Sequence, residues 1–148
     1  MKVSNLLHEE DFSFLTVSTR EEALKLLCQK AFEKGYIPDL DAFQKAILER
    51  EGIMSTGIGL GVAVPHCKMD SLEDFFIISS VLSDPVEWDA IDSVPVKAIF
   101  MIGGPSRKHK EYLQLLSKLI LLVKNPTRRE QLFAVQSASQ ILALFDQF

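Results

Sequence analysis

A histidine directly after a proline is the residue best placed to do chemistry in this chain. His66 follows Pro65 at the end of the apolar run Val62-Ala63-Val64, which predicts a short strand. Ligands of open α/β sheets bind at the carboxyl ends of strands, and the proline ring fixes the backbone just before the imidazole. A neutral imidazole presented in this way can act as a nucleophile. The alternative is an ordinary turn histidine, which is the commoner role of a single histidine.

Three polar residues just before this strand could converge on His66. Arg50 ends an expected helix, and its guanidinium presents a planar fork that suits phosphate oxygens. The alternative for Arg50 is a cation favoured at a helix C-terminus. Ser55 and Thr56 are short hydroxyl donors where a glycine-rich loop begins at Gly57, and their alternative role is hydrogen bonding within the turn. Together these residue types suggest a phosphate site.

A second histidine lies in the first turn of another expected helix. His109 is in register with Leu113 and Leu116, which predicts that it faces inward. A phosphate there would meet free backbone N–H groups and the positive end of the helix dipole. The alternative is a hydrogen-bonded histidine at the edge of the core. Its neighbours form either a solvated face or a surface that docks an acidic partner: Arg107, Lys108 and Lys110.

Other sites suggested by the residue types are rejected on spacing. The run Gly57-Ile58-Gly59-Leu60-Gly61 lacks the order and interval of a dinucleotide fingerprint. It predicts a flexible loop that allows close backbone approach, and the alternative is a helix-to-strand connection that merely turns. Cys67 makes no dyad with His66, because adjacent side chains of extended backbone point to opposite faces. His8, His66 and His109 lack the spacing of metal ligands, so no metal site is predicted.

The apolar spacing predicts five helices that position these residues. The first is capped at Ser18 or Thr19, each of which has a glutamate three residues on, and Gly35 closes it. The others lie between Asp39 and Gly52, from after Pro105 to about Lys124, from Pro126, and from Ser137 to Phe145. The long third helix is expected to bury Leu113, Leu116, Leu119, Ile120 and Val123.

Runs of β-branched and aromatic residues predict the strands. They are Phe12 to Val17 at the edge, the short run cut off by Pro65, Phe75 to Leu82, Val96 to Ile102, and a short one at Val86 to Trp88. Helices at both ends with strands between them favour a layered α/β domain with a mixed sheet.

Composition limits the class of protein. The chain has 148 residues, 47% of them apolar and 24% charged, which suits a single domain over residues 1–148. A net charge of -4 argues against nucleic-acid binding, which needs a basic surface. The sequence shows no signal for membrane insertion or secretion. The two cysteines, Cys28 and Cys67, suit a reducing compartment, so we expect a cytoplasmic protein.

The run from Arg50-Glu51 through Ser55-Thr56-Gly57 to Pro65-His66 resembles the enzyme IIA domain of the fructose/mannitol type. That family belongs to the phosphoenolpyruvate-dependent sugar phosphotransferase system and includes a nitrogen-regulatory branch. The likeness continues through 86–90, Pro95-Val96 and the helix after Pro105, and so covers nearly the whole chain.

The resemblance implies a fold, a reaction and partners. The fold would be a three-layer α/β/α sandwich with a mixed central sheet. His66 would be the phosphorylated nucleophile and Arg50 the residue that stabilises the phosphate, with no cofactor. An HPr-type phosphohistidine carrier would supply the phosphoryl group and a IIB cysteine would receive it. Arg50 would disfavour the imidazolium form and keep His66 reactive. Access for these partners predicts a shallow site with an apolar rim drawn from Ile58, Leu60 and Val62.

The chain departs from the family pattern at three positions. Leu60 stands where many members have asparagine, and Cys67 where glycine is common. Tyr112, before Leu113, takes the place of a second active-site histidine, whereas His109 lies one turn earlier on the same helix face. Either Tyr112 or His109 could therefore support the phosphate.

Three other functions remain open at this point. In the first, phosphorylation controls binding to regulatory target proteins without any sugar transport. In the second, the domain is a binding module without phosphotransfer. In the third, Cys67 carries out thiol chemistry, which requires a lowered pKa of that cysteine.

Overall fold

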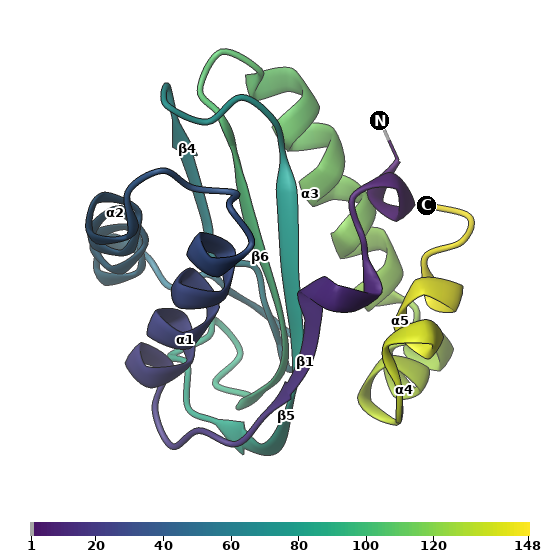
Figure 1. The fold of residues 1–148 in the computed structure, drawn as a ribbon. Coiled ribbons are helices and arrows are strands. Elements are labelled where there is room, and N and C mark those ends of the chain that lie inside the picture. The colour runs from purple at the N-terminus through teal and green to yellow at the C-terminus, as the bar shows by residue number, and fades with distance from the viewer. Residues whose placement is uncertain (1) are drawn as a thin grey trace.

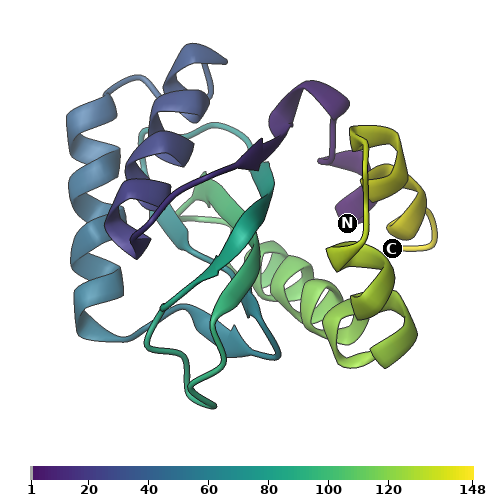
Figure 2. The same ribbon diagram turned by 90° about the horizontal axis from the view of Figure 1, so that it is seen from below.

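A mixed β-sheet with helices on both faces forms the centre of the computed structural model, which describes residues 2–148 (Figures 1 and 2). Strands β1, β5, β6, β3 and β2 lie side by side in that order, and β4 also pairs with β6. Their bounds are Phe12–Leu15 (β1), Gly57–Gly59 (β2), Val62–Ala63 (β3), His66–Met69 (β4), Phe76–Val86 (β5) and Val96–Pro105 (β6). The three-layer α/β/α arrangement expected from the resemblance is confirmed.

The sheet mixes parallel and antiparallel pairs. The long strands β5 and β6 form an antiparallel pair, with Ile77 opposite Ile102. Both β3 and β4 run parallel to β6, and the edge strand β1 runs parallel to β5. Because β5 and β6 are buried along most of their length, they hold the two helical layers apart and fix where the edge strands lie.

Helices α1 (Arg20–Glu33) and α2 (Leu40–Ile53) cover one face of the sheet (Figure 1). The side chains of Thr19 and Asp39 cap them by accepting hydrogen bonds from backbone N–H groups in the first turn. Gly35 follows α1 with φ of 77°, the left-handed conformation expected where a helix closes. Both predicted helices are therefore confirmed, with Thr19 as the cap of the first.

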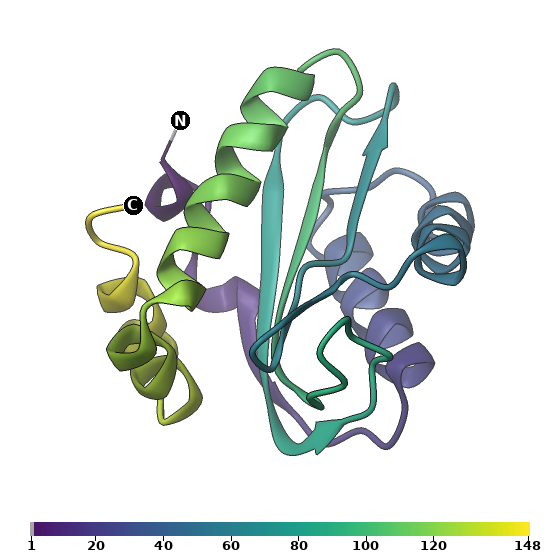
Figure 3. The same ribbon diagram turned by 180° about the vertical axis from the view of Figure 1, so that it is seen from behind.

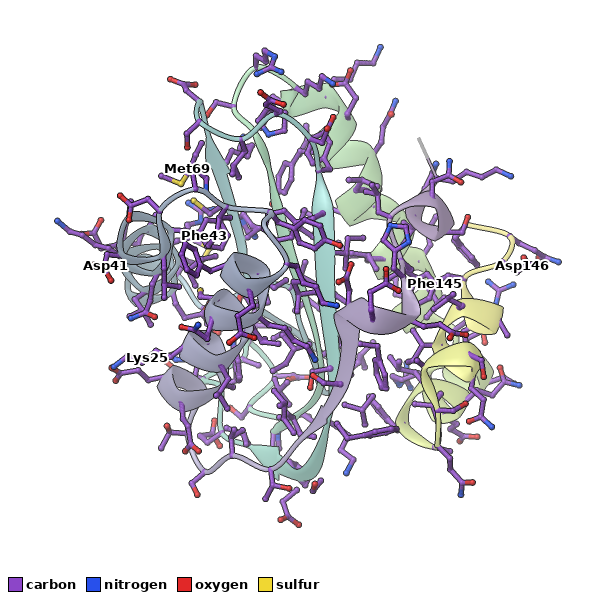
Figure 4. All side chains as sticks on the ribbon, in the orientation of Figure 1. Lys25, Asp41, Phe43, Met69, Phe145 and Asp146 are labelled. Carbon is purple, nitrogen blue, oxygen red and sulfur yellow. The ribbon has the colours of Figure 1, made fainter. Side chains whose placement is uncertain are left out.

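Helices α3 (His109–Lys124), α4 (Pro126–Phe133) and α5 (Ala138–Leu144) cover the opposite face. Two short 3₁₀ helices, Val3–Asn5 (η1) and Glu9–Asp11 (η2), lie on the same side, and the Val3 N–H donates to the Phe148 carbonyl at 2.7 Å, which brings the chain ends together. Each face has its own core: Phe43 belongs to the α1–α2 core and Phe145 to the α3–α5 core (Figure 4).

The buried stripe of α3 differs from the predicted one. Leu113 is 46% exposed, and the buried residues of the helix are Tyr112, Leu115, Leu119, Leu122 and Val123. Leucines occupy so many positions of this helix that two neighbouring stripes fit the period, and packing against the sheet selects between them.

Two other local expectations were wrong. The predicted loop 57–61 is a tight hairpin of β2 and β3, and its turn residue Leu60 has a positive φ of 60°. The segment Val86 to Trp88 is no separate strand, because Val86 is the last residue of β5 and pairs with Val96.

Within residues 2–148, no helix has the length and apolarity to cross a membrane.

Candidate functional site

His66 lies at a break in the strand that runs beside β6. Ala63 pairs with Ile99 and His66 pairs with Ile102, so the chain resumes the parallel ladder after Val64-Pro65. The Pro65 carbonyl accepts the Ile102 N–H at 2.9 Å, whereas the missing N–H of the proline interrupts the regular strand. The prediction that the short strand is cut off at Pro65 is therefore confirmed, but a further strand, β4, which was not expected, begins at His66.

A hydrogen bond fixes the His66 ring. Nδ1 lies 2.9 Å from the Val64 carbonyl oxygen. Because a carbonyl only accepts, Nδ1 carries the hydrogen, and in the neutral ring Nε2 keeps its lone pair. The ring is half-buried, so the geometry presents Nε2 as the nucleophilic nitrogen.

The surroundings of His66 favour the neutral ring. Burial lowers the pKa of His66 below its usual value, and the nearby charges of Arg50 and Lys68 lower it further. The hydrogen bond to Val64 and the charge of Glu51 act in the opposite direction without reversing the shift. The unprotonated, nucleophilic form therefore dominates at neutral pH.

The imidazole lines a pocket of about 470 Å³ where α2, β4 and the start of α3 meet. Figure 3 shows the N-terminal end of α3 near the upper end of β4, with α2 on the far side of that strand. The lining residues are Ala46, Arg50, His66, Cys67, Lys68, His109, Tyr112, Leu113 and Leu116. Another pocket of about 460 Å³, between α4 and α5, has no titratable lining residue.

Arg50 and the two aromatic candidates of α3 therefore share one pocket with His66. The Tyr112 ring centroid lies 5.1 Å from that of His66 and 6.1 Å from that of His109. Tyr112 is buried, and burial raises the pKa of its hydroxyl to about 12, so the hydroxyl stays protonated. His109 does not face inward as expected: it is exposed at the pocket rim, because α3 turns its Tyr112 side to the sheet.

The hydroxyls of Ser55 and Thr56 make other bonds and do not line this pocket. Ser55 Oγ donates to the Trp88 carbonyl at 2.9 Å and accepts the Gly57 N–H at 3.1 Å. Thr56 donates its N–H and its hydroxyl to the buried carboxylate of Glu51 at 2.8 and 2.6 Å. Gly57 packs so closely that a Cβ there would lie 2.7 Å from Cβ of Ala90.

Their geometry instead supports the backbone of the site. The Thr56 carbonyl accepts the Val64 N–H at 3.0 Å, and the Val64 carbonyl in turn holds His66. Glu51, Thr56 and Val64 thus connect the end of α2 to the imidazole. Sequence reasoning did not identify Glu51 in this role. Its spacing, five residues before a threonine at a helix end, is only a weak indication of the hydrogen bonds that it makes.

The apolar rim of the pocket is formed by other residues than those predicted. Val62 is fully buried, and neither Ile58 nor Leu60 lines the pocket. The apolar lining comes from Ala46 and from two leucines of α3, of which Leu113 is 46% exposed. Apolar groups do border the pocket, but α2 and α3 supply them in place of the glycine loop.

Cys67 lines the same pocket as His66, but the two side chains have different packing partners. Its side chain packs with the α1–α2 core, whereas His66 packs toward Tyr112. Burial raises the pKa of the Cys67 thiol, which disfavours the thiolate needed for thiol catalysis. Among residues 2–148, no group of three or more His, Cys, Asp or Glu side chains is arranged to hold a metal ion.

Known proteins resemble the chain over nearly its whole length. The model of the family described as "Phosphoenolpyruvate-dependent sugar phosphotransferase system, EIIA 2" matches residues 5–148. A fructose-specific EIIA component of Haloferax volcanii is 33% identical over 84% of the chain and 80% of its own length. A fructose-specific EIIABC component of Bacillus subtilis is 29% identical over 99% of the chain, which spans only 23% of that protein.

The structural comparison agrees. The crystal structure of the nitrogen regulatory protein IIA-Ntr from Neisseria meningitidis superimposes with a TM-score of 0.91 and 26% identity, over 97% of this chain and 98% of that one. The match of the family model to residues 5–148 and these relatives show that the chain belongs to the EIIA 2 family of the phosphoenolpyruvate-dependent sugar phosphotransferase system.

Proposed function

We propose that this protein carries a phosphoryl group on Nε2 of His66, receives it from an HPr-type phosphohistidine carrier and passes it to a IIB cysteine. One observation carries the proposal: Nδ1 of His66 is bonded to Val64 while the ring lines a pocket that also contains Arg50. The family to which the chain belongs supports the same reaction class.

The transfer to this protein balances without an added base. The Nε2 lone pair attacks phosphorus, the N–P bond of the donor histidine breaks, and the donor imidazole leaves. No proton has to leave Nε2, because the neutral ring carries its hydrogen on Nδ1. As positive charge develops on the His66 ring, the Val64 carbonyl stabilises the Nδ1–H group.

Arg50 and Tyr112 would stabilise the transferred group. Arg50 is exposed on α2 and its guanidinium can neutralise the charge of the phosphoryl oxygens. Tyr112 keeps its hydrogen because burial raises its pKa to about 12, so its hydroxyl can donate to the same oxygens. Phosphoryl transfer depends chiefly on such positioning and charge stabilisation. Ser55, Thr56 and Gly57 then act through the backbone that holds His66.

In the onward step, a thiolate of the IIB cysteine attacks phosphorus and the N–P bond to His66 breaks. The electron pair returns to Nε2, which restores the neutral ring. Both partner proteins must reach the pocket, and the exposed side chain of Leu113 beside it offers an apolar contact for a docked protein surface.

A regulatory role is the second candidate. The match to IIA-Ntr, with a TM-score of 0.91 over 97% of the chain, favours it. In that case the phosphorylation state of His66 controls binding to a regulatory target protein, and no sugar is transported. Passage of phosphate to a cognate IIB component separates the two roles, because only the transport role requires it.

The direct test is phosphorylation of the full chain with phosphoenolpyruvate, enzyme I and an HPr-type carrier. We expect one acid-labile phosphate per chain, located on His66 by mass spectrometry and absent from His66→Ala. His8→Ala is the matched control because His8 is exposed and outside the pocket. Phosphate that persists in His66→Ala would refute the assignment.

We further infer that residues 1–148 act as one domain in the cytoplasm. Continuous pairing of β1 to β6 and the family match over residues 5–148 support the single domain. The two unpaired cysteines, Cys28 and Cys67, suit a reducing compartment. The net charge of -4 disfavours nucleic acid as a partner.

A further inference from the structure

Lys68 reaches the same pocket as His66 from the neighbouring position on its strand face. Both residues lie in β4, and side chains two residues apart in a strand point to the same side. The Lys68 ammonium lies 5.0 Å from the centroid of the Tyr112 ring and contacts Nδ1 of His109. The sequence alone suggested no role for Lys68.

The contact between Lys68 and His109 determines where the His109 ring carries its proton. A lysine ammonium can only donate hydrogen bonds. Nδ1 of His109 must therefore accept, and the neutral ring then carries its hydrogen on Nε2. The two histidines of the pocket are held in opposite tautomers: His66 offers a lone pair at Nε2, and His109 offers an N–H donor at Nε2.

The pocket also has a surplus of cations. Neither Arg50 nor Lys68 belongs to any of the ion pairs formed among residues 2–148. Both line the pocket, from α2 and β4 respectively. A phosphoryl group carries two negative charges and three acceptor oxygens, so a cationic pocket that also offers N–H and O–H donors suits it.

We propose that Lys68 is a positioning residue that holds His109 as the Nε2–H tautomer, so that His109 donates a hydrogen bond to the phosphoryl group on His66. This inference rests on the proposed function of His66. It makes His109 of α3 a second phosphoryl-binding group in addition to Arg50 of α2, with Lys68 of β4 acting on the phosphoryl group only through His109. The Tyr112 ring lies near both imidazoles, with its centroid 5.1 Å from that of His66 and 6.1 Å from that of His109.

The first test reads the tautomers without any phosphate. Two-bond proton–nitrogen NMR spectra of the ¹⁵N-histidine-labelled chain at neutral pH distinguish protonated from unprotonated ring nitrogens. We expect an Nε2–H signal for His109 in the wild-type chain and a mixture of tautomers in Lys68→Met. Lys68→Arg should retain the Nε2–H tautomer because a guanidinium also only donates. Finding mainly Nδ1–H at His109 in the wild-type chain would overturn the proposal.

The second test measures the rate of phosphoryl uptake from the phosphorylated HPr-type carrier. We expect Lys68→Met to slow uptake roughly tenfold, the loss of about one charge-assisted hydrogen bond, and Lys68→Arg to restore most of it. The double variant Lys68→Met/His109→Ala should be no slower than His109→Ala alone, because Lys68 acts through His109. Lys25→Met is the matched control: Lys25 projects into solvent from α1 (Figure 4) and forms an ion pair with Glu21 on the same helix.

These tests separate the proposal from the function on which it rests. If the wild-type chain takes up no phosphate on His66, the proposed function fails, whereas the NMR spectra still report on Lys68 and His109. If uptake on His66 is normal but Lys68→Met changes neither the tautomer of His109 nor the rate, the role of Lys68 is refuted and the role of His66 stands.

Discussion

The buried carboxylate of Glu51 offers a sharp test of how the site is held in place. Glu51 is 4% exposed and accepts two hydrogen bonds from Thr56, at 2.8 Å from its N–H and 2.6 Å from its hydroxyl. The Thr56 carbonyl then holds Val64, whose carbonyl orients His66. Glu51→Ala removes the carboxylate and leaves the N–H and the hydroxyl of Thr56 without their acceptors.

The expected loss follows from the two bonds. A hydrogen bond to a charged group contributes about 1.5–3 kcal/mol, and a buried donor left unpaired costs about 1–3 kcal/mol. Arg20 adds little, because it lies 3.8 Å from Glu51, is one third exposed and keeps a 3.0 Å bond to the Trp88 carbonyl. We therefore expect Glu51→Ala to lower the free energy of unfolding by about 3–5 kcal/mol.

Two variants make the comparison specific. Glu51→Gln keeps one acceptor oxygen for the Thr56 N–H, and its amide can donate to the Thr56 hydroxyl, so we expect a loss of about 1–2 kcal/mol. Glu49→Ala on the same helix removes only an exposed pair with Lys45 at 4.0 Å, and its effect should stay below about 0.5 kcal/mol.

Urea unfolding followed by circular dichroism measures all three variants, provided that the m-value stays constant. Phosphoryl uptake, measured on the folded fraction, should also slow in Glu51→Ala, because the backbone that orients His66 loses a support. A loss of stability below about 1 kcal/mol in Glu51→Ala would refute the assigned role of the carboxylate.

Three further predictions follow from the same geometry. The rate of phosphoryl uptake should stay level near neutral pH and fall only below about pH 6.5, because burial lowers the pKa of His66 and the ring protonates only in more acidic solution. Arg50→Gln should slow uptake, and its rate should begin to fall at a higher pH than in the wild-type chain, since removal of the Arg50 cation raises the pKa of His66. An unchanged pH profile would contradict this. Tyr112→Phe should slow uptake roughly tenfold while the thermal midpoint stays nearly constant, and an unchanged rate would exclude the hydroxyl from the site. Gly103→Ala places a Cβ 2.3 Å from the ring of Phe76, which pairs with Gly103 on β5, so we expect about 1–3 kcal/mol of destabilisation in thermal unfolding. Gly52→Ala on α2 meets nothing within 4 Å and should stabilise the protein by about 0.5–1 kcal/mol. Equal effects of the two changes would be inconsistent with the packing.

Much of the architecture could be predicted because its signals are local. Thr19 and Asp39 cap helices through their own side chains, and the composition of the two long strands marks them as buried. The association of Arg50 with His66 was expected from the family resemblance, and the structure places both in one pocket. Their roles in phosphoryl transfer stay predictions until the uptake experiment is done.

The errors share a long-range cause. Leu113 was expected inside and is exposed, because the helical period cannot choose between adjacent leucine stripes until α3 packs on the sheet. The strand β4, directly after Pro65, was not expected, because only pairing with the distant strand β6 makes these residues a strand. Ser55 was assigned to phosphate, whereas the Trp88 carbonyl, from another part of the chain, takes its hydrogen bond.

The sequence by itself determined the five helices, the two long strands, the nucleophile candidate His66 and its cationic neighbour Arg50, since caps, residue spacing and composition act over a few residues. Only the tertiary structure decided that α3 completes the pocket with Tyr112 and His109, and that Lys68 meets His109 across it. The physical reason is that the orientation of a side chain depends on which surface its element buries, and segments far apart in the chain supply that surface.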